Sequence, residues 1–108
     1  MALPPLSPEQ RRAALTKAAE ARRARAAVKS RLKSGELTIV DVITMAQTDE
    51  IMAKMRVTAL LESMPGVGKA KAATIMDRLG IAATRRLRGL GDNQVARLRE
   101  EFEIPFAP

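Results

Sequence analysis

Cysteine, histidine, tryptophan and tyrosine are all absent from the 108-residue sequence, and only two phenylalanines are present. These absences exclude disulfides, thiol nucleophiles, zinc fingers and imidazole acid–base catalysis. Stacking of unpaired bases on aromatic side chains, the usual way to hold single-stranded nucleic acid, is nearly unavailable. We therefore expect no catalytic residues, no metal and no cofactor.

Long apolar runs are missing as well, and none approaches the about 20 residues needed to span a bilayer. The first residues, MALPPLSP, lack the basic and apolar segments of a secretory signal. We therefore expect a cytoplasmic chain without a membrane partner. The length fits one domain, because two separate cores would each be too small to fold unaided.

Basic residues are abundant and unevenly placed. The chain has 19 Lys and Arg against 12 Asp and Glu, a net charge of +7. Residues 8–34 contain nine basic and two acidic residues, which is the whole excess, and residues 65–91 contain six basic and one acidic. A polyanion is the expected partner of such a chain. A hydrophobic content of 46% argues against a disordered tail.

The hydrophobic spacing predicts an all-α fold with a long N-terminal helix and several short ones. Ser7 and Gln10 form a capping box before a stretch without glycine, which places a long basic helix over residues 8–34. Residues 1–7 are expected to be a loose arm. Residues 35–104 are expected to form a compact helical domain within the single globular domain.

The long helix has one face that can pack and one that is charged. Ala21, Ala24, Val28 and Leu32 share a face, so the C-terminal half should dock while the N-terminal half is weakly anchored. A neighbouring stripe is a possible second DNA surface, formed by Arg11, Arg22, Arg25, Lys29 and Lys33. A plain spacer is the simplest alternative. A membrane-surface helix fits poorly, because such helices have Trp, Phe or Leu on their apolar face.

Turn and cap residues divide the rest of the chain into short elements. Thr38, Thr48 or Asp49, Thr84 and Asp92 are candidate caps, and Gly80 is a stop. The expected elements are helices over 37–46, 49–55, 57–64 and 69–79, one turn over 85–88 and a last helix over 92–103. The helices at 57–64 and 69–79 frame a hairpin motif, and residues 84–91 form an arginine turn.

The stretch Pro65-Gly66-Val67-Gly68-Lys69-Ala70-Lys71 is the most specific motif. A helix, a Pro-Gly-apolar-Gly hairpin and a second helix are typical of helix–hairpin–helix and helix–two-turns–helix DNA-binding motifs. Both glycines are expected to permit a positive φ and a close approach of the backbone to a ligand. Val67 should point inward, and small alanines at 70, 72 and 73 should let the helices approach closely. The first amides of the second helix favour a phosphate, and Lys69 and Lys71 add full charges.

The motif has three other interpretations. A phosphate loop of the Walker type requires a longer glycine loop after a strand, which is missing here. An ordinary corner between two helices would use the glycines for packing alone. A lyase would use a hairpin lysine beside a carboxylate such as Asp77, but the short chain leaves no room for a base-flipping pocket.

A second cluster, Arg85, Arg86 and Arg88, follows on one short turn. Three arginines cannot all face the core, and no acidic residue is adjacent to compensate them. Arginine is suited to bidentate phosphate contacts and to a narrow minor groove. The alternative is a turn that is simply solvated.

The segment MPGVGKAKAATIMDRLGI, followed by RRLRGLG and preceded by a basic Ala-rich helix, closely resembles the actinobacterial integration host factors over residues 6–104. Residues 57–103 more distantly resemble the helix–two-turns–helix region of a small-subunit ribosomal protein and of formamidopyrimidine-type DNA glycosylases. The family resemblance implies a monomeric nucleoid protein that binds duplex DNA with little sequence preference. It also implies roles in DNA compaction and topology, phage integration and transcription. By motif match, the expected DNA contacts are Pro65, Gly66, Val67, Gly68, Lys69, Lys71, Arg85, Arg86 and Arg88.

We therefore expect the hairpin and the arginine turn to bind phosphates of double-stranded DNA, with the long helix on the same duplex or on a second one. Phosphate contacts position a protein without specifying sequence, so any preference should come from DNA shape. The alternative function is an RNA-binding or ribosome-associated protein, which uses the same phosphate chemistry. A DNA-repair enzyme and a protein scaffold are further alternatives.

Overall fold

The computed structural model describes residues 5–103, and every regular element in that range is helical. The all-α prediction is confirmed. Residues 1–4 of the predicted arm and residue 104 of the predicted compact domain lie outside the described residues. No helix within 5–103 is long and apolar enough to cross a membrane. The elements are α1 (Pro8–Ser34), α2 (Ile39–Met45), α3 (Glu50–Ala53), α4 (Val57–Glu62), α5 (Lys69–Arg78), the 3-10 helix η1 (Leu87–Gly89) and α6 (Asp92–Glu103).

Local sequence explains both ends of α1. The Ser7 hydroxyl accepts a hydrogen bond from the Gln10 amide at 3.1 Å, and the Gln10 side chain accepts one from the Ser7 amide at 2.9 Å. This capping box satisfies two amides that the helix leaves unpaired. At the other end, Gly35 adopts a left-handed φ of 85°, a conformation that ends many helices.

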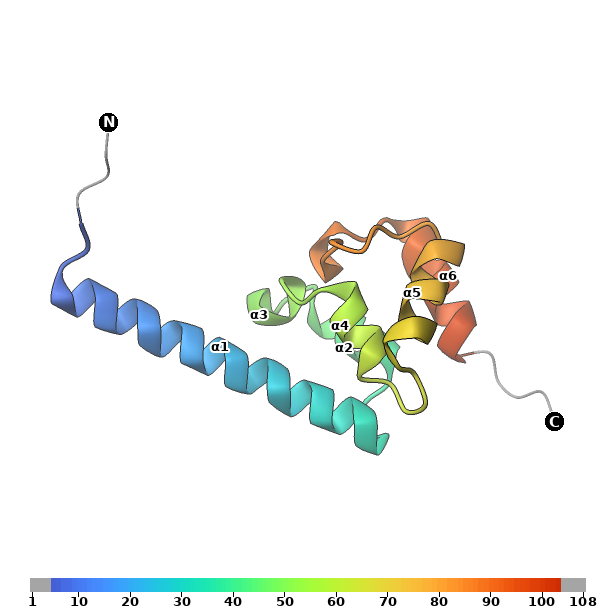
Figure 1. Cartoon of the computed structure of the whole chain (residues 1–108), viewed down its shortest axis with the longest axis horizontal. Coiled ribbons are helices and arrows are strands. Elements are labelled where there is room, and N and C mark those ends of the chain that lie inside the picture. The colour runs from blue at the N-terminus through green and yellow to red at the C-terminus, as the bar shows by residue number, and fades with distance from the viewer. Residues whose placement is uncertain (1–4, 104–108) are drawn as a thin grey trace.

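The N-terminal half of α1 projects from the rest of the molecule. The helix projects as a rod from a compact body (Figure 1), and the whole molecule measures 59 × 31 × 26 Å. Residues 8–18 are exposed, whereas Val28 and Leu32 are buried. The C-terminal half is therefore the part that docks, as the sequence predicts.

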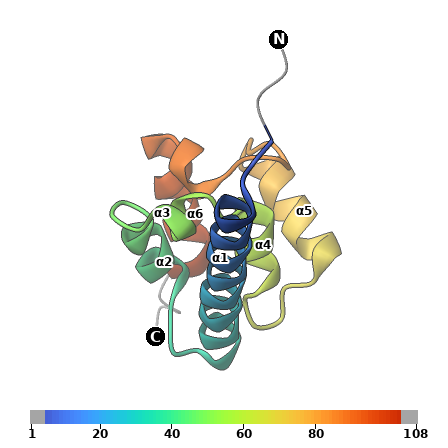
Figure 2. The same cartoon turned by 90° about the vertical axis from the view of Figure 1, so that its left-hand side faces the viewer.

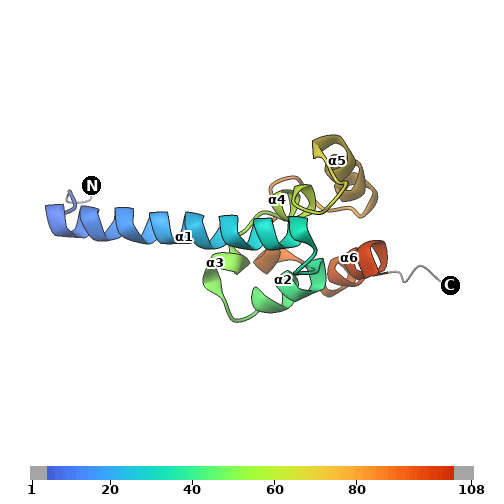
Figure 3. The same ribbon diagram turned by 90° about the horizontal axis from the view of Figure 1, so that it is seen from below.

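The body consists of two groups of helices on either side of α1. Viewed along α1, α4 and α5 lie on one side, and α2, α3 and α6 lie on the other (Figure 2); the view from below shows the same division (Figure 3). α4 packs on α5, and α2 contacts α3 and α6. One apolar core joins these layers, and its fully buried large side chains are Leu32, Ile39, Val42, Met52, Met55, Val57, Leu60, Leu61 and Leu98.

Side-chain caps define the two short helices after α1. Thr38 and Asp41 form a capping box at the start of α2, and the Asp49 carboxylate accepts hydrogen bonds from the amides of Ile51 and Met52. α3 ends at Ala53, two residues before the predicted end. Asp49, rather than Thr48, is the cap.

The predicted turn over 85–88 is displaced. Arg86 pairs with Arg56 in an isolated antiparallel bridge, and η1 begins only at Leu87. The Val57 amide donates to the Arg85 carbonyl and the Leu87 amide donates to the Met55 carbonyl, both at 2.9 Å. These groups are paired with a segment about 30 residues away, so they cannot form a local turn capped by Thr84.

The cap of α6 is likewise one residue earlier than predicted. The Gly91 carbonyl accepts the first helical hydrogen bond, from the Val95 amide at 3.0 Å. The Gln94 side chain accepts a hydrogen bond from the Gly91 amide at 3.1 Å. Gly91 is therefore the residue before the helix, and Asp92 is its first residue.

Candidate nucleic-acid interface

The hairpin, residues 65–68, joins α4 to α5. Gly66 turns the chain with a left-handed φ of 74°. The Val67 amide donates to the Met64 carbonyl at 3.1 Å, and the Val67 side chain is buried with 8% exposure. Val67 therefore points inward, as predicted, and Pro65 and Gly66 are left on the surface.

Gly68 differs from the sequence-based expectation, because it does not use a positive φ. It precedes α5 with φ −92° and ψ −174°, an extended conformation that any residue can adopt. A Cβ atom built on Gly68 would have no atom within 4 Å. Neither backbone strain nor packing within the protein thus requires glycine at this position.

The start of α5 presents amides and positive charge together. No side chain caps this end of the helix, so its first amides have no intrahelical partner. Lys69 and Lys71 are both exposed on the first turn. The arrangement suits an anion that approaches past Gly68.

Only one of the three small alanines packs the two helices. Ala72 is fully buried, whereas Ala70 and Ala73 are exposed. The expectation that all three sit at the contact is wrong, because the helical repeat places only one of them on the buried face with Ile75 and Met76.

The arginine cluster does not form a single patch. The Arg85 side chain is half-buried and folds over Gly89, with Nη1 2.7 Å from the Gly89 carbonyl and 3.5 Å from Oε1 of Gln94. Arg86 extends the opposite way and donates to the Lys54 carbonyl at 2.6 Å. Arg88 lines a different groove, between α2 and α6. Some of the N–H donors of Arg85 and Arg86 are therefore already bonded to other atoms of the protein.

A cleft of about 390 Å³ brings cations from three separate segments together. We call this the basic cleft; its cationic residues are Arg25, Lys29, Lys54, Arg56 and Arg86, and Met55 and Ala59 also line it. The other members of the predicted stripe, Arg11, Arg22 and Lys33, are exposed outside the cleft. Sequence reasoning missed Lys54 and Arg56, since they belong to no recognisable motif and only the tertiary bridge at Arg56 brings them beside Arg86 and α1.

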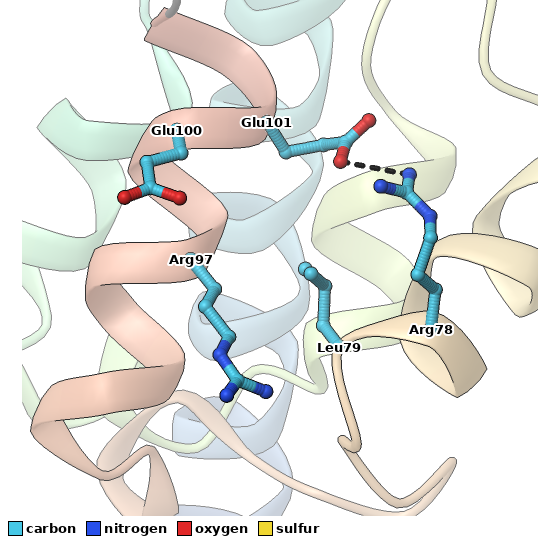
Figure 4. A pocket seen from close by; sticks show the side chains of 5 residues that line it. All are labelled: Arg78, Leu79, Arg97, Glu100 and Glu101. Atoms are coloured by element: carbon cyan, nitrogen blue, oxygen red, sulfur yellow. Dashed lines mark ion pairs between the residues drawn. The ribbon is translucent and has the colours of Figure 1, made fainter.

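Other basic residues are paired with carboxylates. Arg78 Nη2 lies 2.7 Å from Oε1 of Glu101, and this hydrogen bond and the attraction between the charges raise the pKa of the guanidinium. The two belong to a pocket of mixed charge between α5 and α6, which also contains Arg97 and Glu100 (Figure 4). Arg31 likewise pairs with Glu36 at 3.2 Å. These sites are poor anion sites, and no group of three acidic side chains that could hold a metal occurs within residues 5–103.

Two packed helices joined by a glycine hairpin, inside an all-helical body, define a helix–two-turns–helix protein. Residues 32–102 match the S13-like H2TH domain family. The chain is 60% identical over 102 residues to the integration host factor of Streptomyces coelicolor, covering 94% of this chain and 95% of that one. It is 60% identical over 103 residues to the integration host factor of Mycolicibacterium smegmatis, with coverage of 95% and 98%.

A solved structure described as sIHF bound to an 8-bp palindromic DNA is also similar. It superposes with a TM-score of 0.80 at 55% identity, over 81% of this chain and 98% of that chain. The protein described here belongs to the actinobacterial integration host factor family.

Proposed function

We propose that this protein binds double-stranded DNA with little sequence preference, through contacts to backbone phosphates at the hairpin. It acts as a nucleoid-associated architectural protein in the cytoplasm and has no catalytic activity. The DNA-bound structure of a 55% identical neighbour supports the choice of partner. The phosphate contacts are assigned to Gly66, Gly68, Lys69 and Lys71, with Arg85, Arg86 and Arg88 extending them. Pro65 shapes the exposed surface of the hairpin, and Val67, which is buried and whose amide donates to the Met64 carbonyl, holds the hairpin in place.

Gly68 is the observation that supports this assignment most strongly. The fold leaves an open space where its side chain would be and adopts a backbone conformation open to any residue. A glycine without a role in folding is explained if a ligand must approach its backbone closely. The uncapped amides of α5 and the two exposed lysines make a phosphate the best-suited ligand.

The cellular effects follow from binding without sequence specificity. A monomer that binds many sites affects DNA compaction and topology, phage integration and transcription. The exposed N-terminal half of α1 projects from the body and includes Arg11. We propose that this half is a second surface, with which one monomer bridges two duplexes.

Binding of structured RNA is the second candidate, because the matching domain family is described as S13-like and the resemblance to a ribosomal protein covers the same region. Both ligands present phosphates to the hairpin. The two ligands differ in groove width and depth, since RNA double helices are A-form.

Fluorescence anisotropy with the full chain tests the proposal. Labelled random-sequence duplex DNA, A/T-rich duplex, single-stranded DNA and structured RNA are compared at the same salt concentration. We expect the two duplexes to bind within a few-fold of each other and more tightly than the single strand or the RNA. Tighter binding of RNA than of either duplex DNA would show that RNA, and not DNA, is the partner.

Arginine variants refine the assignment. We expect Arg88→Gln to weaken all duplexes to a similar degree without changing the melting temperature. Arg85→Gln should also lower the melting temperature, because it removes the hydrogen bonds to Gly89 and Gln94. Unchanged DNA affinity in Arg88→Gln and in Arg86→Gln would show that the turn is merely solvated.

A further inference from the structure

Two arginines face each other across the only strand-like pairing in residues 5–103. Arg56 and Arg86 are opposite partners of the antiparallel bridge. The hydrogen bonds lie on the flanking residues, from Val57 to Arg85 and from Leu87 to Met55. The arginine pair is therefore of the non-hydrogen-bonded kind, whose Cα atoms are about 4.5 Å apart and whose side chains are close. Like charges directly opposite each other are destabilising.

α1 adds two more cations to the same place. Arg25 and Lys29 are one helical turn apart and line the basic cleft together with the two bridge arginines. Lys54 pairs with Glu50 at 3.3 Å, but no carboxylate is among the described residues that line the cleft. Four of the five cations, all except Lys54, thus make no ion pair within the described structure.

The hydrogen bonding of Arg86 orients it for a ligand. One guanidinium nitrogen, Nη1, donates to the Lys54 carbonyl at 2.6 Å, which holds the group at the cleft wall. The other N–H groups of the planar guanidinium are left to donate hydrogen bonds to a ligand. Arg56 makes no side-chain hydrogen bond or ion pair within the described structure.

We propose that the basic cleft is a binding site for two neighbouring phosphate groups, with Arg56 and Arg86 as the main ligands and Arg25 and Lys29 completing it. Guanidinium groups bind phosphate oxygens in pairs of parallel hydrogen bonds, which suits a site with two adjacent arginines. No aromatic side chain lines the described cleft, and its apolar part is Met55 and Ala59. Recognition is therefore of the phosphates and not of a base.

Two sources supply this chemistry, a free polyphosphate and the backbone of a nucleic-acid strand, and the second rests on the proposed function. The cleft lies at the Arg56 end of α4 and the hairpin follows the other end. The six residues between span about 9 Å. A nucleic-acid strand bound in the cleft would contact both α1 and the body, so that both would belong to one DNA-binding surface. The arginine turn alone lies on the body and does not include α1.

The test is a titration of the full chain with inorganic triphosphate, followed by NMR of the arginine side-chain Nε–H groups. We expect saturable shifts of the Arg56 and Arg86 signals. Affinity should fall at least tenfold in the double variant R56Q/R86Q and change less than twofold in R97Q/R99Q, an equal loss of two charges on the exposed face of α6. The variant R56K/R86K keeps the charge and should still lose several-fold, because lysine cannot bind in a bidentate manner.

Thermal melting of each variant serves as the control that it is still folded. R86Q removes the hydrogen bond to the Lys54 carbonyl, so the single variant R56Q keeps the test valid if the double variant unfolds. Absence of saturable shifts, or equal losses in R56Q and R99Q, would overturn the site, since the effect would be general charge attraction.

A second arm adds saturating duplex DNA and distinguishes the sources. If the cleft takes the backbone, DNA blocks the triphosphate shifts, and R56Q/R86Q lowers the salt slope of DNA binding by about two. If it takes a free polyphosphate, the shifts persist in the DNA complex. Failure of the wild-type chain to bind DNA would refute the proposed function and leave the triphosphate result standing.

Discussion

Two glycines two positions apart serve different purposes in the hairpin. Gly66 is required by the fold, because its φ of 74° lies in the left-handed region. Gly68 has an ordinary backbone conformation and empty space where a Cβ would be. At the scale of single residues, the pair therefore separates a role in folding from a role in binding.

A methyl group at each position should reveal this difference. Gly66→Ala should destabilise the fold by about 1–2 kcal/mol, the cost of a left-handed conformation with a side chain. Gly68→Ala, at the N-cap of α5, should lower the urea unfolding midpoint less than Gly66→Ala does and weaken duplex DNA binding about tenfold, or about 1.4 kcal/mol. Urea unfolding and anisotropy measure the two effects. Unchanged affinity in Gly68→Ala would mean that no ligand approaches this backbone.

The sequence was least informative about individual long side chains. The hairpin motif names its exposed lysines correctly, because their exposure follows from the helical repeat around Ala72. Where Arg85 and Arg86 point depends on hydrogen-bond partners 4 to 32 residues away, and Arg88 lies in a groove between α2 and α6. Composition cannot specify such partners, so the three arginines were expected to act together and instead point to three places.

At the scale of elements, capping residues determine where the helices begin. α1 and α2 each start with a reciprocal capping box, a local pattern that the sequence displays in full. In α2, the Thr38 amide donates to the Asp41 carboxylate at 2.8 Å. This bond and the Thr38 hydroxyl, with a lesser contribution from the charge of Arg31, lower the pKa of Asp41 below its ordinary value of 3.8, while loss of solvent opposes them.

The capping box predicts how stability depends on pH. Because the folded-state pKa of Asp41 is depressed, the contribution of its carboxylate is complete above 3.8 and is lost as the pH falls through the folded-state pKa. Asp41→Asn should be less stable than the wild type at pH 7, and the difference should shrink below pH 3.8. Urea unfolding from pH 7 to pH 2 measures it. Asp77→Asn, at a carboxylate with no hydrogen bond in the described structure, is the control. A difference that stays constant down to pH 2 would contradict this account.

α1 is divided between stability and binding. Its buried contacts come from Val28 and Leu32. Residues 8–18 are exposed, and Ala14, Lys17 and Ala18 among them line a groove beside α3. Deletion of residues 1–18 should therefore leave the free energy of unfolding nearly unchanged and remove the three basic residues Arg11, Arg12 and Lys17.

The same deletion tests bridging. If the N-terminal half contacts a second duplex, the shortened chain should bind one duplex but no longer pull down a labelled second one. Leu32→Ala is the contrasting variant, since a cavity at this fully buried position should cost about 2–5 kcal/mol and leave the cations of α1 present. Equal bridging by the full and the shortened chain would refute the second surface.

At the scale of the whole molecule, the charge separates into surfaces that the net value of +7 does not reveal. The hairpin lysines lie at one end of α4, the basic cleft lies at the other, and the free half of α1 projects beyond them. Arg78 and Arg31 are neutralised by glutamates. The helices and the hairpin could be predicted because caps, glycines and the helical repeat are local. The Arg56–Arg86 bridge and the cleft could not, because they arise where distant segments meet in the core.

If these surfaces bind the DNA backbone and not the bases, the salt dependence of affinity shows it most directly. Each neutralised phosphate contributes about −0.9 to the slope of log affinity against log salt concentration, so six to eight contacts predict a slope of about −5 to −7. The slope should be the same for random and A/T-rich duplexes. A slope of about −1, or a strong difference in affinity between the random and the A/T-rich duplex at every salt concentration, would contradict backbone binding.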